Sequence, residues 1–285
     1  MSTIKKIAVL GTGVLGSQIA FQAAYFGYDV TAYDISDEVL EKARPRFAGL
    51  AKTYQADKMV AATLERTDAA LARLTLTSDL GEAVADADLV IEAVPEVLEI
   101  KRETYTKLSS LAPAKTIFAT NSSTLLPSEM KEFTGRPDRF LALHYANQVW
   151  RYNTAEIMGT ADTDPGVFAA VVEFAIGSGL IPIELKKEKA GYVLNSLLVP
   201  LLTAAAGLLL GGFADVETID KTWRLATGAP SGPFQIYDVV GLNTAYNIAT
   251  TSADPRMQAW AAFLKENYID KGKLGVATGE GFYKY

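Results

Sequence analysis

A glycine-rich turn near the N-terminus constrains the fold of this chain more than any other feature. The turn Gly11-Thr12-Gly13-Val14-Leu15-Gly16 follows directly on an apolar run, Ile4–Leu10, and leads into an apolar segment of helical character, Gly16–Phe26. A second strand-like run, Tyr28–Tyr33, is followed directly by Asp34. A strand, a G-x-G-x-x-G turn, a helix and a strand that ends in an acidic residue together indicate a βαβ unit that binds a dinucleotide. The alternative is a tight strand–helix turn that binds no ligand.

The three glycines of this turn have separate physical tasks. Gly11 permits the sharp turn, Gly13 lets a pyrophosphate approach the backbone, and Gly16 lets the helix pack closely on the strand. Free N–H groups at the start of the helix, which includes Val14 and Leu15, would bind the phosphates.

Asp34 indicates which dinucleotide is bound. Its carboxylate can accept hydrogen bonds from the adenosine ribose hydroxyls, and it would repel a 2′-phosphate. The next residues, Ile35 and Ser36, include no arginine that would attract such a phosphate. The sequence therefore favours NAD(H) as the cofactor over NADP(H).

Strand-like and helix-like segments alternate along the first part of the chain. The expected strands are 4–10, 28–33, 74–77, 89–94, 116–120, 140–144 and 180–184, and the expected helices are 16–26, 36–54, 61–72 and 96–111. Such alternation predicts crossover connections and a mainly parallel sheet. After residue 190 helical patterns dominate, at 197–210, 215–226, 241–250 and 255–268. We therefore expect an α/β fold, with an N-terminal Rossmann-like NAD-binding domain over 1–187 and a C-terminal all-α substrate and dimerisation domain over 188–285.

Charge and composition exclude several classes of protein. The 285 residues include 27 basic and 33 acidic side chains, so the net charge is −6, which argues against a nucleic acid partner. The absence of cysteine excludes disulfides and thiolate metal sites, and a single histidine excludes a multi-histidine site, so no metal is expected. The N-terminal residues 1–6 lack the layout of a signal peptide, which makes the cytoplasm the expected compartment.

The apolar run 197–210 has two interpretations. No residue between Lys189 and Asp215 is charged, and this uncharged stretch, which contains the run 197–210, is long enough to cross a bilayer. Polar residues and a proline interrupt it, however, and the chain has no second segment of this kind. We therefore expect a helix buried in a domain core or a subunit interface, and no membrane partner.

Polar residues follow two of the expected strands. The single histidine, His144, ends the apolar strand Phe140–Leu143, and the run Asn121–Thr124 follows the strand 116–120. The carboxyl ends of parallel strands border the ligand crevice, and a histidine there can exchange a proton near neutral pH. A structural histidine and a helix-capping turn are the alternatives for these two features.

Two further polar residues lie in apolar surroundings. Glu156 belongs to the stretch Ala155–Met158, and Asn195 follows Gly191–Leu194. A buried carboxylate or amide needs hydrogen-bond partners, which makes both residues candidates for the site. The alternatives are a solvent-facing strand position for Glu156 and helix–helix hydrogen bonding for Asn195.

Together these motifs resemble the 3-hydroxyacyl-CoA dehydrogenase family over essentially the whole chain. The matching features recur in the family's order and spacing, and they are Gly11–Gly16, the Glu96 and Lys101 pair, Asn121–Ser123, His144–Asn147, Glu156, Gly191–Asn195 and Gly279–Tyr283. Within the family, the segments 120–127 and 185–195 are most similar to the bacterial diketoreductases.

The resemblance implies a role for each matched residue. His144 would be the general acid/base, and Glu156 would hold its second ring nitrogen. Ser123 and Asn195 would donate hydrogen bonds to the substrate oxygen. The residues that would lie near the nicotinamide and its ribose are Ser123, Asn147, Glu96 and Lys101. The helical second domain would form a homodimer.

The implied activity is NADH-dependent reduction of 3-keto (β,δ-diketo) esters or acyl derivatives to the hydroxy product. The alternatives are an L-3-hydroxyacyl-CoA dehydrogenase, a sugar-acid dehydrogenase of the L-gulonate type, and dinucleotide binding without catalysis.

One segment, 147–155, differs from the common family pattern, which has proline after the asparagine. We expect this segment to line the substrate cleft, where Trp150 and Tyr152 would make the pocket more aromatic and Arg151 would add a cation. In the alternative of a sugar-acid dehydrogenase, Arg151 would hold the substrate carboxylate. A local basic cluster is interpreted as a solvated helix face, and it consists of Lys42, Arg44, Arg46 and Lys52.

Overall fold

The computed structural model of the chain describes residues 4–57 and 62–285. The chain forms two compact units, Met1–Val193 and Leu194–Tyr285. Residues 1–3 of the expected first domain, and residue 61 at the start of the expected helix 61–72, lie outside the described residues.

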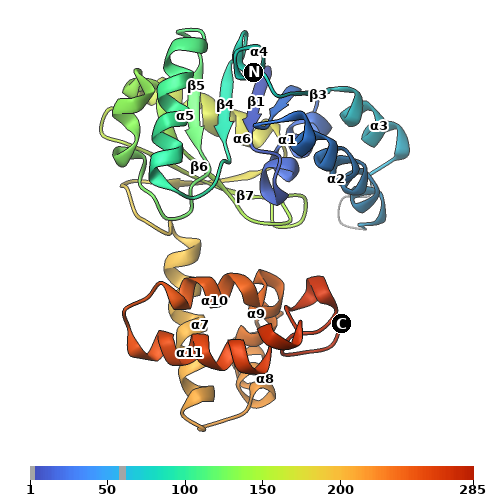
Figure 1. Ribbon diagram of the computed structural model, residues 1–285, viewed down its shortest axis with the longest axis vertical. Coiled ribbons are helices and arrows are strands. Elements are labelled where there is room, and N and C mark those ends of the chain that lie inside the picture. The colour runs from blue at the N-terminus through green and yellow to red at the C-terminus, as the bar shows by residue number, and fades with distance from the viewer. Residues whose placement is uncertain (1–3, 58–61) are drawn as a thin grey trace. The chain divides into compact units, whose positions relative to one another are not determined.

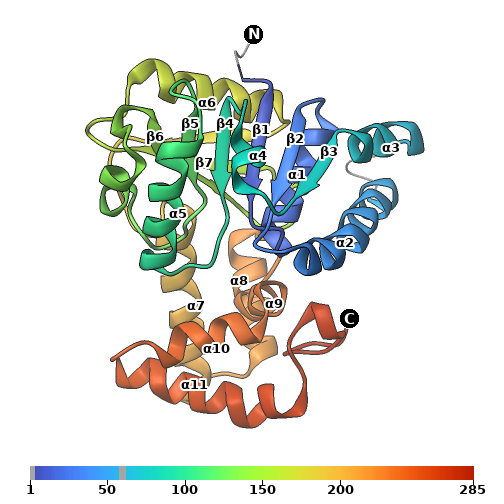
Figure 2. The ribbon, with the colours of Figure 1, turned by 45° about the horizontal axis from the view of Figure 1, so that its top comes forward.

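The first unit is built on one sheet of eight strands in the order β3-β2-β1-β4-β5-β6-β7-β8 (Figures 1 and 2). The strands are β1 (Lys6–Leu10), β2 (Asp29–Tyr33), β3 (Leu74–Thr77), β4 (Leu89–Glu92), β5 (Ile117–Thr120), β6 (Phe140–Tyr145), β7 (Thr154–Gly159) and β8 (Ile181–Leu185). All neighbouring strands are parallel except β6 and β7. The predicted mainly parallel, Rossmann-like sheet is confirmed.

Helices cover both faces of this sheet because side chains alternate along each strand. Val9 packs into a core that contains residues of α1 (Val14–Tyr25), α2 (Asp37–Ala56) and α6 (Pro165–Gly177). Its neighbours Ala8 and Leu10 pack into a second core, against α4 (Leu80–Val84) and α5 (Leu98–Leu111). Helix α3 (Leu64–Ala72) packs beside α1 and α2, and 3₁₀ turns follow β5 at Pro127–Glu129, Lys131–Thr134 and Pro137–Arg139.

The strand register brings distant parts of the sequence to one edge of the sheet. Leu10 pairs with Glu92, Glu92 with Thr120, and Thr120 with Ala142. These strands are parallel, so the segments that follow them all leave at the same edge. The glycine-rich turn, the segment that follows Glu92, the run 121–124 and His144 therefore share this edge.

The antiparallel pair β6–β7 has a simple cause. Only residues 146–153 separate the two strands, and this is too short for the crossover connection that a parallel pair requires. The chain therefore turns back as a hairpin, and the register places His144 directly opposite Glu156.

The second unit is helical, as predicted. Its helices are α7 (Leu194–Leu210), α8 (Val216–Thr227), α9 (Pro233–Val240), α10 (Leu242–Thr250) and α11 (Pro255–Asn267). Their core includes Phe234, Leu242 and Trp260. Among residues 4–57 and 62–285, no helix combines the length and apolar character that a membrane crossing needs.

Two fully buried carboxylates fix the C-terminal segment of this unit. Asp220 accepts hydrogen bonds from the N–H groups of Phe234 and Gln235 and from the Tyr283 hydroxyl. Asp238 accepts from the N–H groups of Phe282 and Tyr283 and from the Tyr285 hydroxyl. Burial raises the pKa of Asp238. The C-terminal motif 279–283 therefore has a structural role in this unit.

Candidate active site

The glycine-rich turn has the backbone geometry expected for it. Gly11 has φ +97°, and a Cβ atom there would lie 2.6 Å from the Ala93 carbonyl oxygen. A Cβ atom on Gly16 would lie 2.0 Å from the Gly11 carbonyl oxygen. Both positions therefore require glycine for reasons internal to the protein.

Gly13 differs from the other two glycines. It has φ −60°, and apart from Gly13 and its two neighbours in the chain, no atom of the described residues lies within 4 Å of the position where its Cβ would be. The protein itself therefore gives no reason for glycine here, whereas close approach of a pyrophosphate would give one. Gly13 is also the N-cap of α1, which has no capping side chain and no acidic residue in its first turn. The start of α1 thus fits the phosphates of a dinucleotide.

Asp34 is held beside this turn. One of its carboxylate oxygens accepts hydrogen bonds from the Thr12 N–H and hydroxyl, both at 2.7 Å. Arg46, on α2, donates to the Thr12 carbonyl oxygen from the same neighbourhood. The expectation of a wholly solvated basic cluster is therefore wrong for Arg46, because its guanidinium group binds the turn.

His144 lies between two hydrogen-bond partners. Its Nδ1 atom is 3.0 Å from Glu156 Oε2, and its Nε2 atom is 3.0 Å from Ser123 Oγ. His144 and Glu156 are 6% and 4% exposed, so bulk water competes little with this contact. A neutral imidazole with its proton on Nδ1 would donate to Glu156 and accept from Ser123. The second Glu156 oxygen accepts from the Val193 N–H at 2.9 Å.

The Ser122–Thr124 turn, which carries Ser123, is organised by Glu96. A single oxygen of Glu96 accepts hydrogen bonds from the Ser122 hydroxyl, the Ser123 N–H, and the Thr124 N–H and hydroxyl, at 2.6 to 2.9 Å. The other oxygen lies 3.2 Å from Lys101 Nζ. The predicted Glu96 and Lys101 pair is therefore present, and it also supports Ser123.

A buried carboxylate that sequence reasoning missed holds Lys101. Glu92 is 0% exposed, and its Oε1 atom lies 2.6 Å from Lys101 Nζ. Its Oε2 atom accepts hydrogen bonds from the hydroxyls of Thr120 and Tyr105. Such additional hydrogen bonds are what a buried ion pair needs to offset desolvation. The available signal was an acidic residue within an otherwise apolar expected strand, 89–94.

The pKa of Glu96 is lowered by these contacts. Partial burial raises it, but the hydrogen bond from Ser122, the charge of Lys101 and the hydrogen bonds from Thr124 outweigh burial. A carboxylate with a lowered pKa stabilises the fold above its ordinary pKa of about 4.3, and this stabilisation is lost as the pH falls through the lower folded value. We therefore expect Glu96→Gln to reduce stability at pH 7, and this deficit to shrink as the pH falls below the ordinary pKa and through the lower folded value. Urea unfolding across this pH range measures the effect.

Glu99→Gln is the matched control for this prediction, because Glu99 lies on the same helix and its side chain is 72% exposed. It should change stability little at any pH. A Glu96→Gln deficit that stayed constant down to pH 3 would contradict the electrostatic explanation.

The segment after His144 is anchored by Asp57. Trp150 Nε1 and Arg151 Nε donate to Asp57 at 3.1 and 3.2 Å, and Arg151 also forms an ion pair with Asp57 at 3.0 Å. Asp57 therefore holds the guanidinium group that would bind the carboxylate of a sugar-acid substrate. Asn147 is exposed in the same segment.

Asn195 lies in the first turn of α7, in the second unit. Its hydrogen bond to the substrate stays a prediction.

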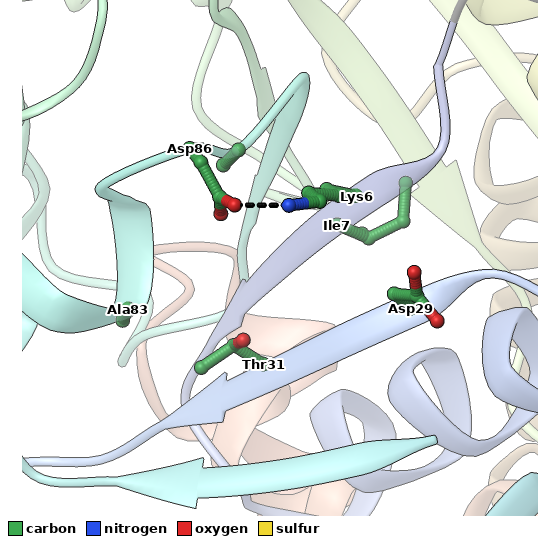
Figure 3. A pocket seen from close by; sticks show the side chains of 7 residues that line it. Lys6, Ile7, Asp29, Thr31, Ala83 and Asp86 are labelled. Atoms are coloured by element: carbon green, nitrogen blue, oxygen red, sulfur yellow. Dashed lines mark hydrogen bonds and ion pairs between the residues drawn. The ribbon is translucent and has the colours of Figure 1, made fainter.

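Two pockets lie away from all these residues. One, of about 230 Å³, is lined by residues at the beginnings of β1 and β2 and after α4, and contains the Lys6 and Asp86 ion pair (Figure 3). The other, of about 670 Å³, borders Phe26, Tyr28 and Ile176. Neither contains a predicted site residue, and the first lies at the opposite end of the strands from His144. Ligands of open parallel sheets bind at the carboxyl ends of the strands.

The parallel sheet, the glycine-rich turn and the hydrogen-bonded His144 at one edge define a dinucleotide-dependent dehydrogenase. Comparison with known proteins specifies this class. Residues 6–188 match the NAD binding domain of 3-hydroxyacyl-CoA dehydrogenase, and residues 191–285 match the C-terminal domain of the same enzyme. The chain belongs to the 3-hydroxyacyl-CoA dehydrogenase family. It is an NAD-dependent oxidoreductase that acts on CH–OH groups, which confirms the predicted enzyme class and cofactor.

Individual relatives are similar over nearly the whole chain. A solved structure of diketoreductase is 64% identical, with a TM-score of 0.96 and complete coverage of both chains. The 3-hydroxybutyryl-CoA dehydrogenase of Bradyrhizobium diazoefficiens is 31% identical, over 100% of this chain and 96% of the relative. The mitochondrial hydroxyacyl-coenzyme A dehydrogenase of Rattus norvegicus is 34% identical, over 99% of this chain and 91% of the relative. The predicted resemblance, including diketoreductase, is confirmed.

Proposed function

We propose that the enzyme reduces 3-keto (β,δ-diketo) esters or acyl derivatives to the hydroxy product, with His144 as the general acid. The observation that carries this proposal is the position of His144 between Glu156 and Ser123 at the edge that also holds the glycine-rich turn. The similarity to a diketoreductase at 64% identity supports the diketo substrate over an acyl-CoA.

The proposed cofactor contacts follow from the geometry of the turn. Gly11, Gly13 and Gly16, with the N–H groups of Val14 and Leu15, would hold the pyrophosphate. Asp34 would accept hydrogen bonds from the adenosine ribose, and Glu96, Lys101 and Asn147 would lie near the nicotinamide side. When bound, NADH supplies the hydride that reduces the ketone.

The protein's own residues would manage the charge that develops on the substrate oxygen. His144 would deliver its proton to that oxygen, while Ser123 and Asn195 would donate hydrogen bonds to it. Glu156 would stabilise the charged imidazole before the proton leaves, and would keep the ring in one orientation. In the oxidative direction the same imidazole would accept the proton.

A substrate panel tests this proposal. We expect rapid NADH oxidation with a 3,5-diketo ester, slower oxidation with an acetoacetyl thioester, and little reaction with a sugar acid and NAD⁺, because Asp57 engages Arg151. Absorbance of NADH measures each rate, and NADPH in parallel tests the interpretation of Asp34. Turnover of none of these compounds would favour dinucleotide binding without catalysis. A homodimer and a cytoplasmic location stay predictions of the sequence.

A further inference from the structure

We propose that Tyr192 is a positioning residue for His144, which holds the imidazole ring in its reactive orientation. The inference rests on the proposed role of His144. The rings of Tyr192 and His144 are stacked, with centroids 4.5 Å apart and an angle of 8° between their planes. Tyr192 is 1% exposed, so this contact is shielded from water.

The need for such a contact follows from the hydrogen bonds of His144. Its partners, Glu156 and Ser123, contact the two ring nitrogens at 3.0 Å each. These two contacts fix the axis through Nδ1 and Nε2, but they leave the ring able to rotate about this axis. A flat aromatic surface against one face of the imidazole opposes this rocking motion, and the Tyr192 ring provides that surface.

The backbone around Tyr192 is shaped for this contact. Gly191 and Tyr192 both have positive φ, at +79° and +49°. Positive φ is unfavourable for tyrosine, and such strain persists only where the surroundings determine the conformation. The two left-handed residues place the Tyr192 ring against His144 and direct the next N–H group, that of Val193, to Glu156 at 2.9 Å.

Hydrogen bonds fix the segment 191–193 to the strand ends that carry the site. The Gly191 N–H donates to the Ser123 carbonyl oxygen at 3.2 Å, and the Tyr192 hydroxyl donates to the Ser122 carbonyl oxygen at 2.8 Å. One segment therefore contacts Glu156, His144 and the turn that carries Ser123. A tyrosine that only filled the apolar cluster with Ala142 and Met158 would need neither the strained backbone nor the parallel rings.

The single histidine allows a direct experiment. In protein labelled with ¹³C and ¹⁵N only at histidine, and purified with a tag that contains no histidine, every imidazole signal belongs to His144. The ring current of Tyr192 shifts the imidazole C–H proton signals upfield. We expect Tyr192→Phe to keep these shifts and a near-normal kcat. We expect Tyr192→Leu to lose them and to lower kcat by about tenfold, with the KM for NADH unchanged.

Phe174→Leu is the matched control, since Phe174 is 0% exposed on α6 and belongs to a different cluster of the core. It should lose stability without moving the imidazole signals. Tyr192→Met, which fills the space with a flexible side chain, replaces the leucine variant if that variant does not fold. Unchanged imidazole signals in the leucine or methionine variant, or a kcat equal to that of Tyr192→Phe, would overturn the proposal. Full activity of His144→Gln would instead refute the proposed function, whereas the imidazole signals of the enzyme that keeps His144 would still report the stacking.

Discussion

Replacement of His144 by glutamine should lower kcat by about 10² to 10⁴-fold while NADH still binds. Glutamine can keep a hydrogen bond to Glu156 or Ser123, but it cannot deliver a proton to the substrate oxygen. The chain has no other histidine to replace it. The loss should therefore fall on kcat, and steady-state rates with a diketo ester measure it.

The control for this prediction is the affinity for the cofactor. The glycine-rich turn lies between β1 and α1, whereas the hydrogen bonds of His144 go to Glu156 and Ser123, so the Kd for NADH should change little. Fluorescence of bound NADH measures this Kd, and circular dichroism checks the fold. A variant with normal kcat would assign the proton transfer to another group and would refute the proposed mechanism.

Gly13→Val should reduce NADH affinity by at least about a hundredfold and leave the fold intact. The position has an ordinary φ of −60° and no neighbouring protein atom within 4 Å, so the chain itself tolerates a side chain there. Loss of the favourable glycine N-cap should lower Tm by no more than about 4 °C. A bound pyrophosphate would meet the valine methyl groups, and titration with NADH measures the effect.

Gly16→Ala gives the informative contrast within the same turn. Its Cβ atom would lie 2.0 Å from the Gly11 carbonyl oxygen, so the backbone must move even without a ligand. Stability and NADH affinity should then fall together. If Gly13→Val bound NADH as tightly as the unchanged enzyme, the dinucleotide would not lie over this turn.

Apolar sequence patterns predicted the strands of the first unit where burial in the sheet requires such a pattern. The apolar strands β1, β4, β5 and β6 are buried on both faces of the sheet, and such strands form continuous apolar runs. Helix α6 was not predicted because it is almost uniformly apolar and lacks a helical period. Helix α9 was not predicted because it is short, with 8 residues, and begins at a proline, Pro233.

Local sequence patterns could not predict which distant residues contact one another. The family resemblance indicated that Glu156 holds His144, but the physical reason is the hairpin that makes them cross-strand partners. Nothing local predicts that Asp57 binds Trp150 and Arg151, which lie about 90 positions further along the chain. The stacking of Tyr192 likewise depends on a backbone conformation that tyrosine rarely adopts.

The aspartates of the second unit make its stability depend on residues 282–285. Four of the six hydrogen bonds to Asp220 and Asp238 come from residues 282–285. Removal of these four residues would leave the two buried carboxylates without those donors, at a cost of several kcal/mol. Loss of residues 282–285 would thus destabilise the helical unit as a whole, and would not simply shorten it.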